Sequence, residues 1–210
     1  MASLPRELPT PIYNLSFLDE KTGYVSSRWH ALQKTKDGGS TWTSGKSIEG
    51  LNYIHFIDEK KGWAFGGAIW HTNDGGENWK QDIGYELVND LWSADFVDSA
   101  NGWIVGSDQV WHTTDGEIWQ SVPNLPHSNQ KFLVVDFIDR QQGWVSRSDG
   151  SLLHSVDGGI NWQVLTVLPQ SATAIRFVSS QEGFALNTKA DLFHSMDGGS
   201  TWTPLPLARK

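Results

Sequence analysis

The chain has 210 residues, of which 38% are hydrophobic and 19% charged, and this balance excludes an intrinsically disordered chain. The net charge is -8 and the sequence has no run of Lys or Arg, so it offers no basic surface that would bind the phosphate backbone of a nucleic acid. The absence of cysteine excludes disulfides and thiolate metal sites, and no apolar run approaches the ~20 residues of a membrane-spanning helix.

Two motifs recur in step along the chain, about 40 residues apart. The first couples a phenylalanine to a glycine and a second aromatic residue, and it reads FLDEKTGY, FIDEKKGW, FVDSANGW, FIDRQQGW and FVSSQEGF from Phe17, Phe56, Phe96, Phe137 and Phe177. The second motif is built around D-G-G followed by a tryptophan, although its third copy, at Asp115, is one residue shorter and reads D-G-E. Two separate motifs with one period indicate five internal repeats.

Each repeat divides into four short runs rich in aromatic and β-branched residues, separated by Gly, Asp and Asn. In the second repeat these runs are Leu51–Phe56, Gly62–Gly66, Ala68–Thr72 and Asn78–Asp82. Four antiparallel strands per repeat are typical of a β-propeller blade. The sequence therefore predicts one all-β domain over residues 1–210, a five-bladed propeller with blades at about 12–46, 51–83, 91–122, 132–167 and 172–205.

The D-G-G motif is predicted to form the turn between the third and fourth strands of each blade. Glycine supplies positive φ, the Asp side chain bonds backbone N–H groups, and the Trp starts the returning strand and packs over the turn. One Asp among glycines is too few ligands for a calcium loop, so we expect no metal site. These structural residues are Asp37, Asp74, Asp115, Asp157 and Asp197, with Trp42, Trp79, Trp119, Trp162 and Trp202.

The S/T-x-D-G-G-x-x-W pattern resembles the Asp-box (BNR) repeat of sialidase-like propellers. Its pairing with F-x-D-x-x-x-G-W resembles the photosystem II stability/assembly-factor family in particular, over most of the chain from about Tyr13 to Trp202. The resemblance implies a non-catalytic scaffold that binds a protein during membrane-protein assembly. It also favours an extracytoplasmic location, in a periplasm or lumen or after secretion. Members of that family are similar to seven-bladed rings, whereas this chain has five repeats.

The innermost strands carry the residues that we select as candidate ligand contacts. Polar side chains precede the shared Phe in every repeat, where neighbouring positions are apolar: Ser16, His55, Asp95, Asp136 and Arg176. Equivalent positions line the channel of a propeller, so these residues form either a plug of ion pairs, such as Arg176 with Asp136, or a ligand or ion site. Nearer the channel mouth the candidates are Tyr13, Asn52 and Trp92, whose aromatic members can stack on a sugar or a peptide.

Catalysis is the competing function. Sialidases use an arginine triad and an R-I-P stretch, which this chain lacks. Glycosidases use paired carboxylates, and Asp95 and Asp136 can mimic such a pair. The five positions before the shared Phe contain no third carboxylate. We therefore expect a non-enzymatic binding protein without a cofactor, and the alternative is a carbohydrate-binding or glycoside-hydrolysing propeller. The expected partner is a protein or glycan rather than nucleic acid. The chain is expected to be a monomer closed into one ring and at most peripheral to membranes.

Overall fold

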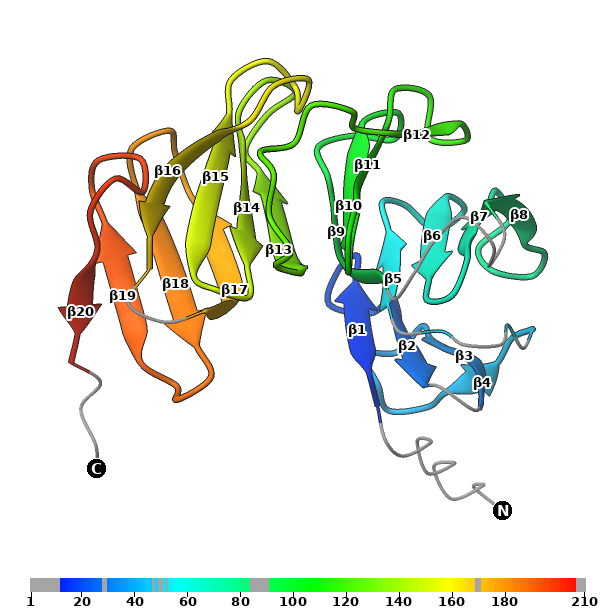
Figure 1. Cartoon of the computed structure of the whole chain (residues 1–210). Helices are drawn as coiled ribbons and strands as arrows, with labels where there is room; N and C mark the ends of the chain where they lie inside the picture. Colours follow the sequence, from blue (N-terminus) through cyan, green and yellow to red (C-terminus); the bar gives the residue numbers. More distant parts are fainter. Residues whose placement is uncertain are drawn as a thin grey trace. The chain divides into compact units, whose positions relative to one another are not determined.

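The computed structural model describes residues 12–27, 30–46, 48, 51, 53–83, 91–168 and 171–206. These ranges contain strands β1 to β20 and no helix (Figure 1). The strands form five four-stranded sheets, each a meander of consecutive strands, which confirms the predicted all-β, blade-type architecture. Among the described residues there is accordingly no helix long and apolar enough to cross a membrane.

The chain divides into two compact units, Met1–Leu91 and Trp92–Lys210. The first unit contains two sheets, which we call blades 1 and 2. Blade 1 consists of β1 (Asn14–Phe17), β2 (Gly23–Ser27), β3 (His30–Thr35) and β4 (Thr43–Ser44). Blade 2 consists of β5 (Tyr53–Phe56), β6 (Gly62–Phe65), β7 (Ile69–Thr72) and β8 (Lys80–Ile83).

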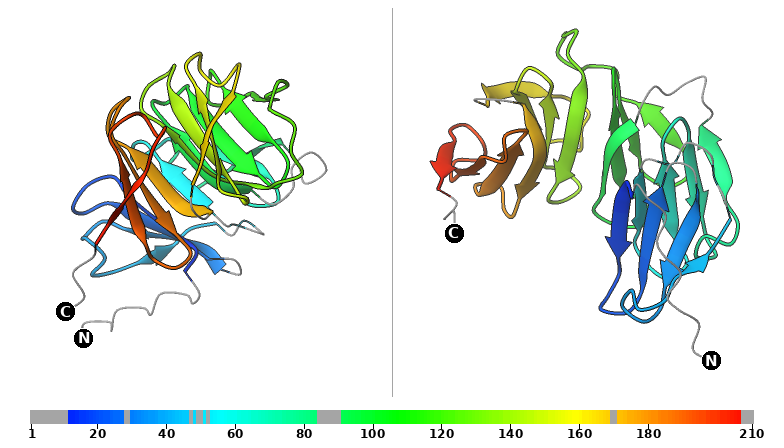
Figure 2. Two further views of the ribbon diagram at one scale, coloured as in Figure 1. Left: turned by 60° about the vertical axis from the view of Figure 1, so that its left-hand side comes forward. Right: turned by 90° about the horizontal axis from the view of Figure 1, so that it is seen from below.

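The second unit contains blades 3 to 5, which are coloured from green to red in Figure 2, although the first residue of its first strand, Leu91, is assigned to the first unit. Blade 3 consists of β9 (Leu91–Phe96), β10 (Gly102–Gly106), β11 (Val110–Thr113) and β12 (Trp119–Ser121). Blade 4 consists of β13 (Phe132–Phe137), β14 (Gly143–Arg147), β15 (Ser151–Ser155) and β16 (Gln163–Val167). Blade 5 consists of β17 (Ala172–Phe177), β18 (Gly183–Asn187), β19 (Leu192–Ser195) and β20 (Thr203–Leu205). The closure of all five blades into one ring stays a prediction.

The D-G-G turns connect the third and fourth strands, as the sequence predicts. In blade 4, Asp157 Oδ1 accepts hydrogen bonds from the Ser155 hydroxyl and from the backbone N–H of Asn161, both at 2.9 Å. Gly158 and Gly159 adopt φ of 74° and 86°, which side-chain-bearing residues rarely adopt. The Trp162 indole N–H donates to the Gly159 carbonyl at 2.9 Å, so the ring folds back over the turn.

The tryptophan does not always begin the returning strand, which corrects one detail of the prediction. Trp119 starts β12, but β8 begins at Lys80, one residue after Trp79. The Trp79 indole is tied to the Gly76 carbonyl at 3.1 Å, which holds this residue in the turn before the strand ladder starts.

Stacked aromatic rings between neighbouring blades form the core of each unit. In the second unit, Trp103 of blade 3 stacks on Phe137 of blade 4 at 3.5 Å between ring centroids, and Trp144 stacks on Phe177 of blade 5 at 3.6 Å. A methyl group on Gly143 would lie 2.4 Å from the Phe137 ring. The shared Phe and the shared Gly therefore recur together because the ring lies directly over the glycine.

Candidate functional site

In blades 1, 3 and 4, the polar residue before the shared Phe accepts a hydrogen bond from the backbone of the next blade. Asp95 Oδ2 accepts a hydrogen bond from the backbone N–H of Phe137 at 2.7 Å. Asp136 Oδ2 accepts one from Phe177 at 2.6 Å, and in the first unit the Ser16 hydroxyl accepts one from Phe56 at 3.4 Å. Innermost strands have no further strand to pair with, so these side chains satisfy backbone donors at an open sheet edge.

Asp95, Asp136 and Arg176 lie together in the second unit. The Arg176 Nη1 atom is 2.8 Å from Asp136 Oδ1 and 3.9 Å from Asp95 Oδ1. The arginine side chain is 68% exposed, whereas that of Asp136 is only 3% exposed. The ion pair that the sequence suggested between Arg176 and Asp136 is thus present, and both carboxylates are also engaged by backbone N–H groups.

Burial dominates the electrostatics of the two carboxyl groups. It raises the pKa of Asp95 to about 6, and the negative charge of Asp136 acts in the same direction, whereas the Phe137 N–H bond and the Arg176 charge oppose it. Burial also raises the pKa of Asp136, against the Phe177 N–H bond and the charge of Arg176. The carboxylate charge on Asp95 is therefore destabilised in the folded protein.

We expect this shift to make folding depend on pH. The pKa of Asp95 is about 6 in the folded chain and about 4 in the unfolded chain, so the folded state binds its proton more tightly. Asp95 makes its full contribution to the free energy of unfolding below about pH 4, and this contribution is lost as the pH rises through about 6. Relative to the Asp95→Asn variant, the free energy of unfolding should fall by about 2–3 kcal/mol across that window.

Urea unfolding of both proteins at a series of pH values, followed by tryptophan fluorescence, measures this difference. The other titrating groups, such as His55, are common to both proteins and largely cancel in the comparison, whereas Asp136 is coupled electrostatically to Asp95. A difference that does not change with pH would contradict the raised pKa of Asp95.

The remaining candidates of the sequence analysis are distributed over both units. In the first unit, burial lowers the pKa of His55 to about 4, so His55 is neutral near neutral pH and supplies no positive charge there. Tyr13 and Trp92 are 46% and 48% exposed, as a stacking contact requires. Asn52 lies outside the described residues. The structure therefore brings together Asp95, Asp136 and Arg176 of the candidate set.

The histidines before the Asp boxes of blades 3 and 4 pack against tryptophan rings of their own blades. His112 stacks on Trp103 and His154 on Trp144, both at 4.7 Å between centroids. Burial lowers the pKa of both histidines, so they remain neutral near neutral pH. Within the described residues, no group of three or more His, Cys, Asp or Glu side chains is arranged to hold a metal ion.

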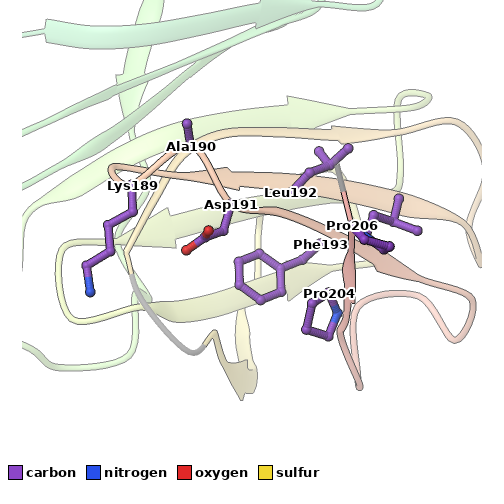
Figure 3. Close-up of a pocket in the computed structure, with 8 residues that line it drawn as sticks. Lys189, Ala190, Asp191, Leu192, Phe193, Pro204 and Pro206 are labelled. Carbon is purple, nitrogen blue, oxygen red and sulfur yellow. The ribbon is translucent and has the colours of Figure 1, made fainter. Parts of the chain in front are cut away.

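A pocket of about 680 Å³ in blade 5 was not foreseen from the sequence (Figure 3). Lys189 and Asp191 lie at one end of it, and Phe193 lies near Pro204. Ala190 in its wall has a φ of 63°, where the corresponding turn of blade 4 has Gly150 at 88°. An alanine in place of that glycine is the sequence signal for an unusual turn, and it could have directed attention to this loop.

The comparisons with known proteins agree with the repeat pattern. Residues 111–210 match the model of the family described as photosynthesis system II assembly factor YCF48. A curated relative, the photosystem II assembly lipoprotein Ycf48 of Synechococcus sp. (strain CC9902), is 37% identical over 71 residues. That alignment covers 32% of this chain and 21% of the relative, so the chain matches about a fifth of that relative's length.

This chain resembles the photosystem II assembly factors, with a match to the family model over residues 111–210. The resemblance to the assembly-factor family noted in the sequence is thereby confirmed. YCF48 of Cyanidioschyzon merolae has a similar fold at 18% identity, with a TM-score of 0.74, covering 95% of this chain and 70% of that one.

Two other solved structures have a similar fold, one a peptide complex and the other an enzyme. A YCF48 bound to D1 peptide matches 92% of this chain and 80% of its own length at 18% identity, with a TM-score of 0.51. The GH74 xyloglucanase from Xanthomonas campestris matches 94% of this chain and 38% of its own length at 14% identity, with a TM-score of 0.74. At these identities the likeness shows the fold alone, and it is shared by binding proteins and enzymes.

Proposed function

We propose that this chain is a non-catalytic binding protein of the assembly-factor type, whose partner is a segment of another protein. The observation that carries this proposal is the match of residues 111–210 to the YCF48 family model. Those residues contain Asp136 and Arg176 and all of blades 4 and 5. The proposal thus assigns the second unit a role in recognising a protein partner.

The state of the two carboxylates supports binding rather than catalysis. A general acid or base must present an oxygen to a substrate. Asp136 uses Oδ1 for Arg176 and Oδ2 for the Phe177 N–H, and Asp95 uses Oδ2 for the Phe137 N–H. Both oxygens of Asp136 are thus engaged, and Asp95 Oδ1 lies 3.9 Å from Arg176 Nη1, which favours a structural role for Asp136 in particular.

The partner class follows from the solved YCF48 complex, in which that protein is bound to a D1 peptide. We propose a peptide of the same kind as the ligand here, with the exposed indole of Trp92 on β9 as one of its contacts. Exposed tryptophans are frequent energetic centres of protein interfaces, since they bury a large area on binding.

A binding measurement tests this proposal. Titration of the chain into a fluorescently labelled D1 peptide should raise the anisotropy of the label, and Trp92→Ala should weaken binding about ten-fold or more. Ile118→Ala is the matched control, because Ile118 is 65% exposed and lies in an Asp-box turn. Absence of binding by the unaltered chain would overturn the proposed partner. Equal affinity of both variants would overturn the assignment of Trp92.

Glycoside binding or hydrolysis remains the second candidate, because Asp95 has a raised pKa near Asp136 and the fold is shared with a GH74 xyloglucanase. Release of reducing ends from xyloglucan by the unaltered chain, abolished in the Asp95→Asn and Asp136→Asn variants, would establish an enzyme. Under our proposal no release occurs. Saturable binding of xyloglucan oligosaccharides without hydrolysis would instead support a glycan-binding protein.

An extracytoplasmic location, peripheral to a membrane, completes the proposal. It is supported by the curated relative, whose name describes it as a lipoprotein. Fractionation of cells that produce the protein from its native gene should place it outside the cytoplasm. Recovery in the cytoplasmic fraction alone would contradict this part of the proposal.

A further inference from the structure

One position of the third strand is a histidine in four of the five blades. It lies opposite the aromatic residue that follows the shared glycine on the second strand, and directly opposite residues of an antiparallel pair lie on the same face of the sheet. The opposed pairs are Tyr24 with Lys34, Trp63 with His71, Trp103 with His112, Trp144 with His154, and Phe184 with His194. Each of these histidines therefore shares a sheet face with that aromatic ring.

In the second unit, two of these histidines belong to the ring stacks that join neighbouring blades. Each stack, which we call a joint, consists of the histidine, the tryptophan of its own blade and the shared Phe of the next blade. The joints are His112 with Trp103 and Phe137, and His154 with Trp144 and Phe177. The interplanar angles are 5° and 4° in the first joint and 19° and 5° in the second. All of these rings belong to the second unit.

Neither joint provides an acceptor for a proton on its histidine. The Nε2 atoms of His112 and His154 are buried and have no hydrogen-bond partner among the described residues. A neutral imidazole can leave one ring nitrogen without a proton, whereas the imidazolium cation carries a proton on both. Protonation of either histidine therefore creates a buried N–H donor without an acceptor, which is unfavourable in the folded protein.

Blade 5 supplies the acceptor that these two joints lack. His194 Nε2 lies 3.0 Å from Glu182 Oε1. Glu182 is the residue before the shared glycine, and the same position holds Asn101 in blade 3 and Gln142 in blade 4. The histidines thus differ because one position of the repeat carries a neutral amide in blades 3 and 4 and a carboxylate in blade 5.

The strands beside the two histidines offer no other negative charge. Strands β10, β11 and β12 of blade 3 contain no Asp, Glu, Lys or Arg. In blade 4, β14, β15 and β16 contain only Arg147, at the end of β14 remote from His154. The Asp-box carboxylates of the two blades, Asp115 and Asp157, accept backbone hydrogen bonds within their own turns.

The charged groups of the following blades are engaged elsewhere. Asp136 on β13 and Arg176 on β17 pair with each other at 2.8 Å. Asp197 of the blade 5 Asp box accepts hydrogen bonds within its own turn, and Arg140 pairs with Asp98. These groups have other partners, so they do not neutralise a positive charge in the joints.

Burial outweighs the one interaction that favours protonation. The face of an aromatic ring attracts a cation, and in blade 1 the Lys34 ammonium group lies 5.0 Å from the centroid of the Tyr24 ring. Burial nevertheless lowers the pKa of both His112 and His154. The joints of the second unit therefore hold these histidines in the neutral form.

We propose that His112 and His154 form an acid switch that loosens the joints of the second unit when the pH falls below about 6.5. Water can accept the added proton's hydrogen bond only where the joint is open, so the unfolded state binds these protons more readily than the folded state. The contribution of the neutral histidines to the free energy of unfolding is complete well above about pH 6.5. It decreases as the pH falls towards their lower pKa in the folded chain.

Asp95 acts in the opposite direction, because its contribution is lost as the pH rises through about 6. A comparison of histidine variants with the unaltered chain separates the two effects, since Asp95 is present in all of these proteins.

Urea unfolding at about pH 7.5 and about pH 5 of the unaltered chain and of a variant with both His112→Phe and His154→Phe tests the proposal. Phenylalanine keeps a ring in each joint but cannot be protonated. The urea midpoint of the unaltered chain should fall relative to that of the variant as the pH is lowered. His127→Gln is the matched control, because His127 is an exposed histidine of the same unit, and it should keep the pH dependence of the unaltered chain. The proposal is overturned if the double variant also keeps that dependence.

NMR of the histidine rings in the unaltered chain provides a readout that requires no variant to fold. The signals of His112 and His154 can be recognised by their proximity to indole protons. Both should titrate with midpoints clearly below about 6.5. Midpoints at or above that value would show that the joints accept the proton, and would overturn the proposal.

Gln142→Glu tests the origin of the switch by giving His154 the carboxylate that Glu182 gives His194. This variant should raise the midpoint of the His154 titration and reduce the loss of stability in acid. Gln141→Glu is the matched control, because it adds the same charge one residue away at an exposed position. Equal shifts of the His154 midpoint in the two variants would contradict the role assigned to the residue before the shared glycine.

Discussion

Replacing Trp144 with alanine should lower the free energy of unfolding of the second unit by about 3–5 kcal/mol. The side chain is completely buried, stacks on Phe177 and His154, and donates its indole N–H to the Gly198 carbonyl. Alanine removes both stacked contacts and leaves a cavity between blades 4 and 5. Urea unfolding followed by the remaining tryptophan fluorescence and by circular dichroism measures the change.

Trp144→Phe is the matched control for this experiment. Phenylalanine retains a ring between His154 and Phe177 but loses the hydrogen bond to Gly198, so the loss should be smaller, about 1–2 kcal/mol. A loss below about 1 kcal/mol for Trp144→Ala would show that the ring stack does not carry the joint between these blades.

Replacing Asp136 with alanine should lower the free energy of unfolding by about 2–3 kcal/mol, the second largest effect of a substitution that we expect. The carboxylate is almost fully buried, accepts the Phe177 N–H at 2.6 Å and pairs with Arg176 at 2.8 Å. Its removal leaves a backbone donor at the edge of β17 without an acceptor and leaves Arg176 with only the longer contact to Asp95. Chemical denaturation at neutral pH gives the change in free energy.

The control for Asp136→Ala is removal of the other partner of the ion pair. The Arg176 side chain is 68% exposed, so Arg176→Gln should cost less than about 1 kcal/mol. Similar losses for the two variants would mean that the ion pair, and not the backbone bond to Phe177, is the main contribution of Asp136.

The repeat pattern was sufficient to predict the blades, because strands and turns depend on local properties. Alternating apolar residues, the positive φ of Gly158 and Gly159, and the Asp157 side chain act within a few residues of one another. The sequence of each repeat therefore predicts the same strands and turns. The strand limits were less accurate, as at Lys80, since the start of a ladder depends on how the neighbouring indole is held.

The candidate site was predicted in part. The sequence selected Asp95, Asp136 and Arg176 because they break an apolar pattern, and the structure places them together. It did not indicate that both carboxylates accept backbone N–H groups of the following blade. The pocket beside Ala190 was missed, because a single substitution in one turn carries little periodic signal.

The sequence by itself determined the number of repeats, their four-strand division and the turn chemistry of the Asp box, all of which act over short separations. Only the tertiary structure decided what the polar residues of the innermost strands do, because their partners are backbone groups about 40 residues away on another blade. It also separated Trp144, which is completely buried between blades 4 and 5, from the equivalent Phe184, which is only partly buried. The physical reason is that equivalent residues of different repeats share their local sequence, but the extent to which each is buried depends on the residues that pack against it from other parts of the chain.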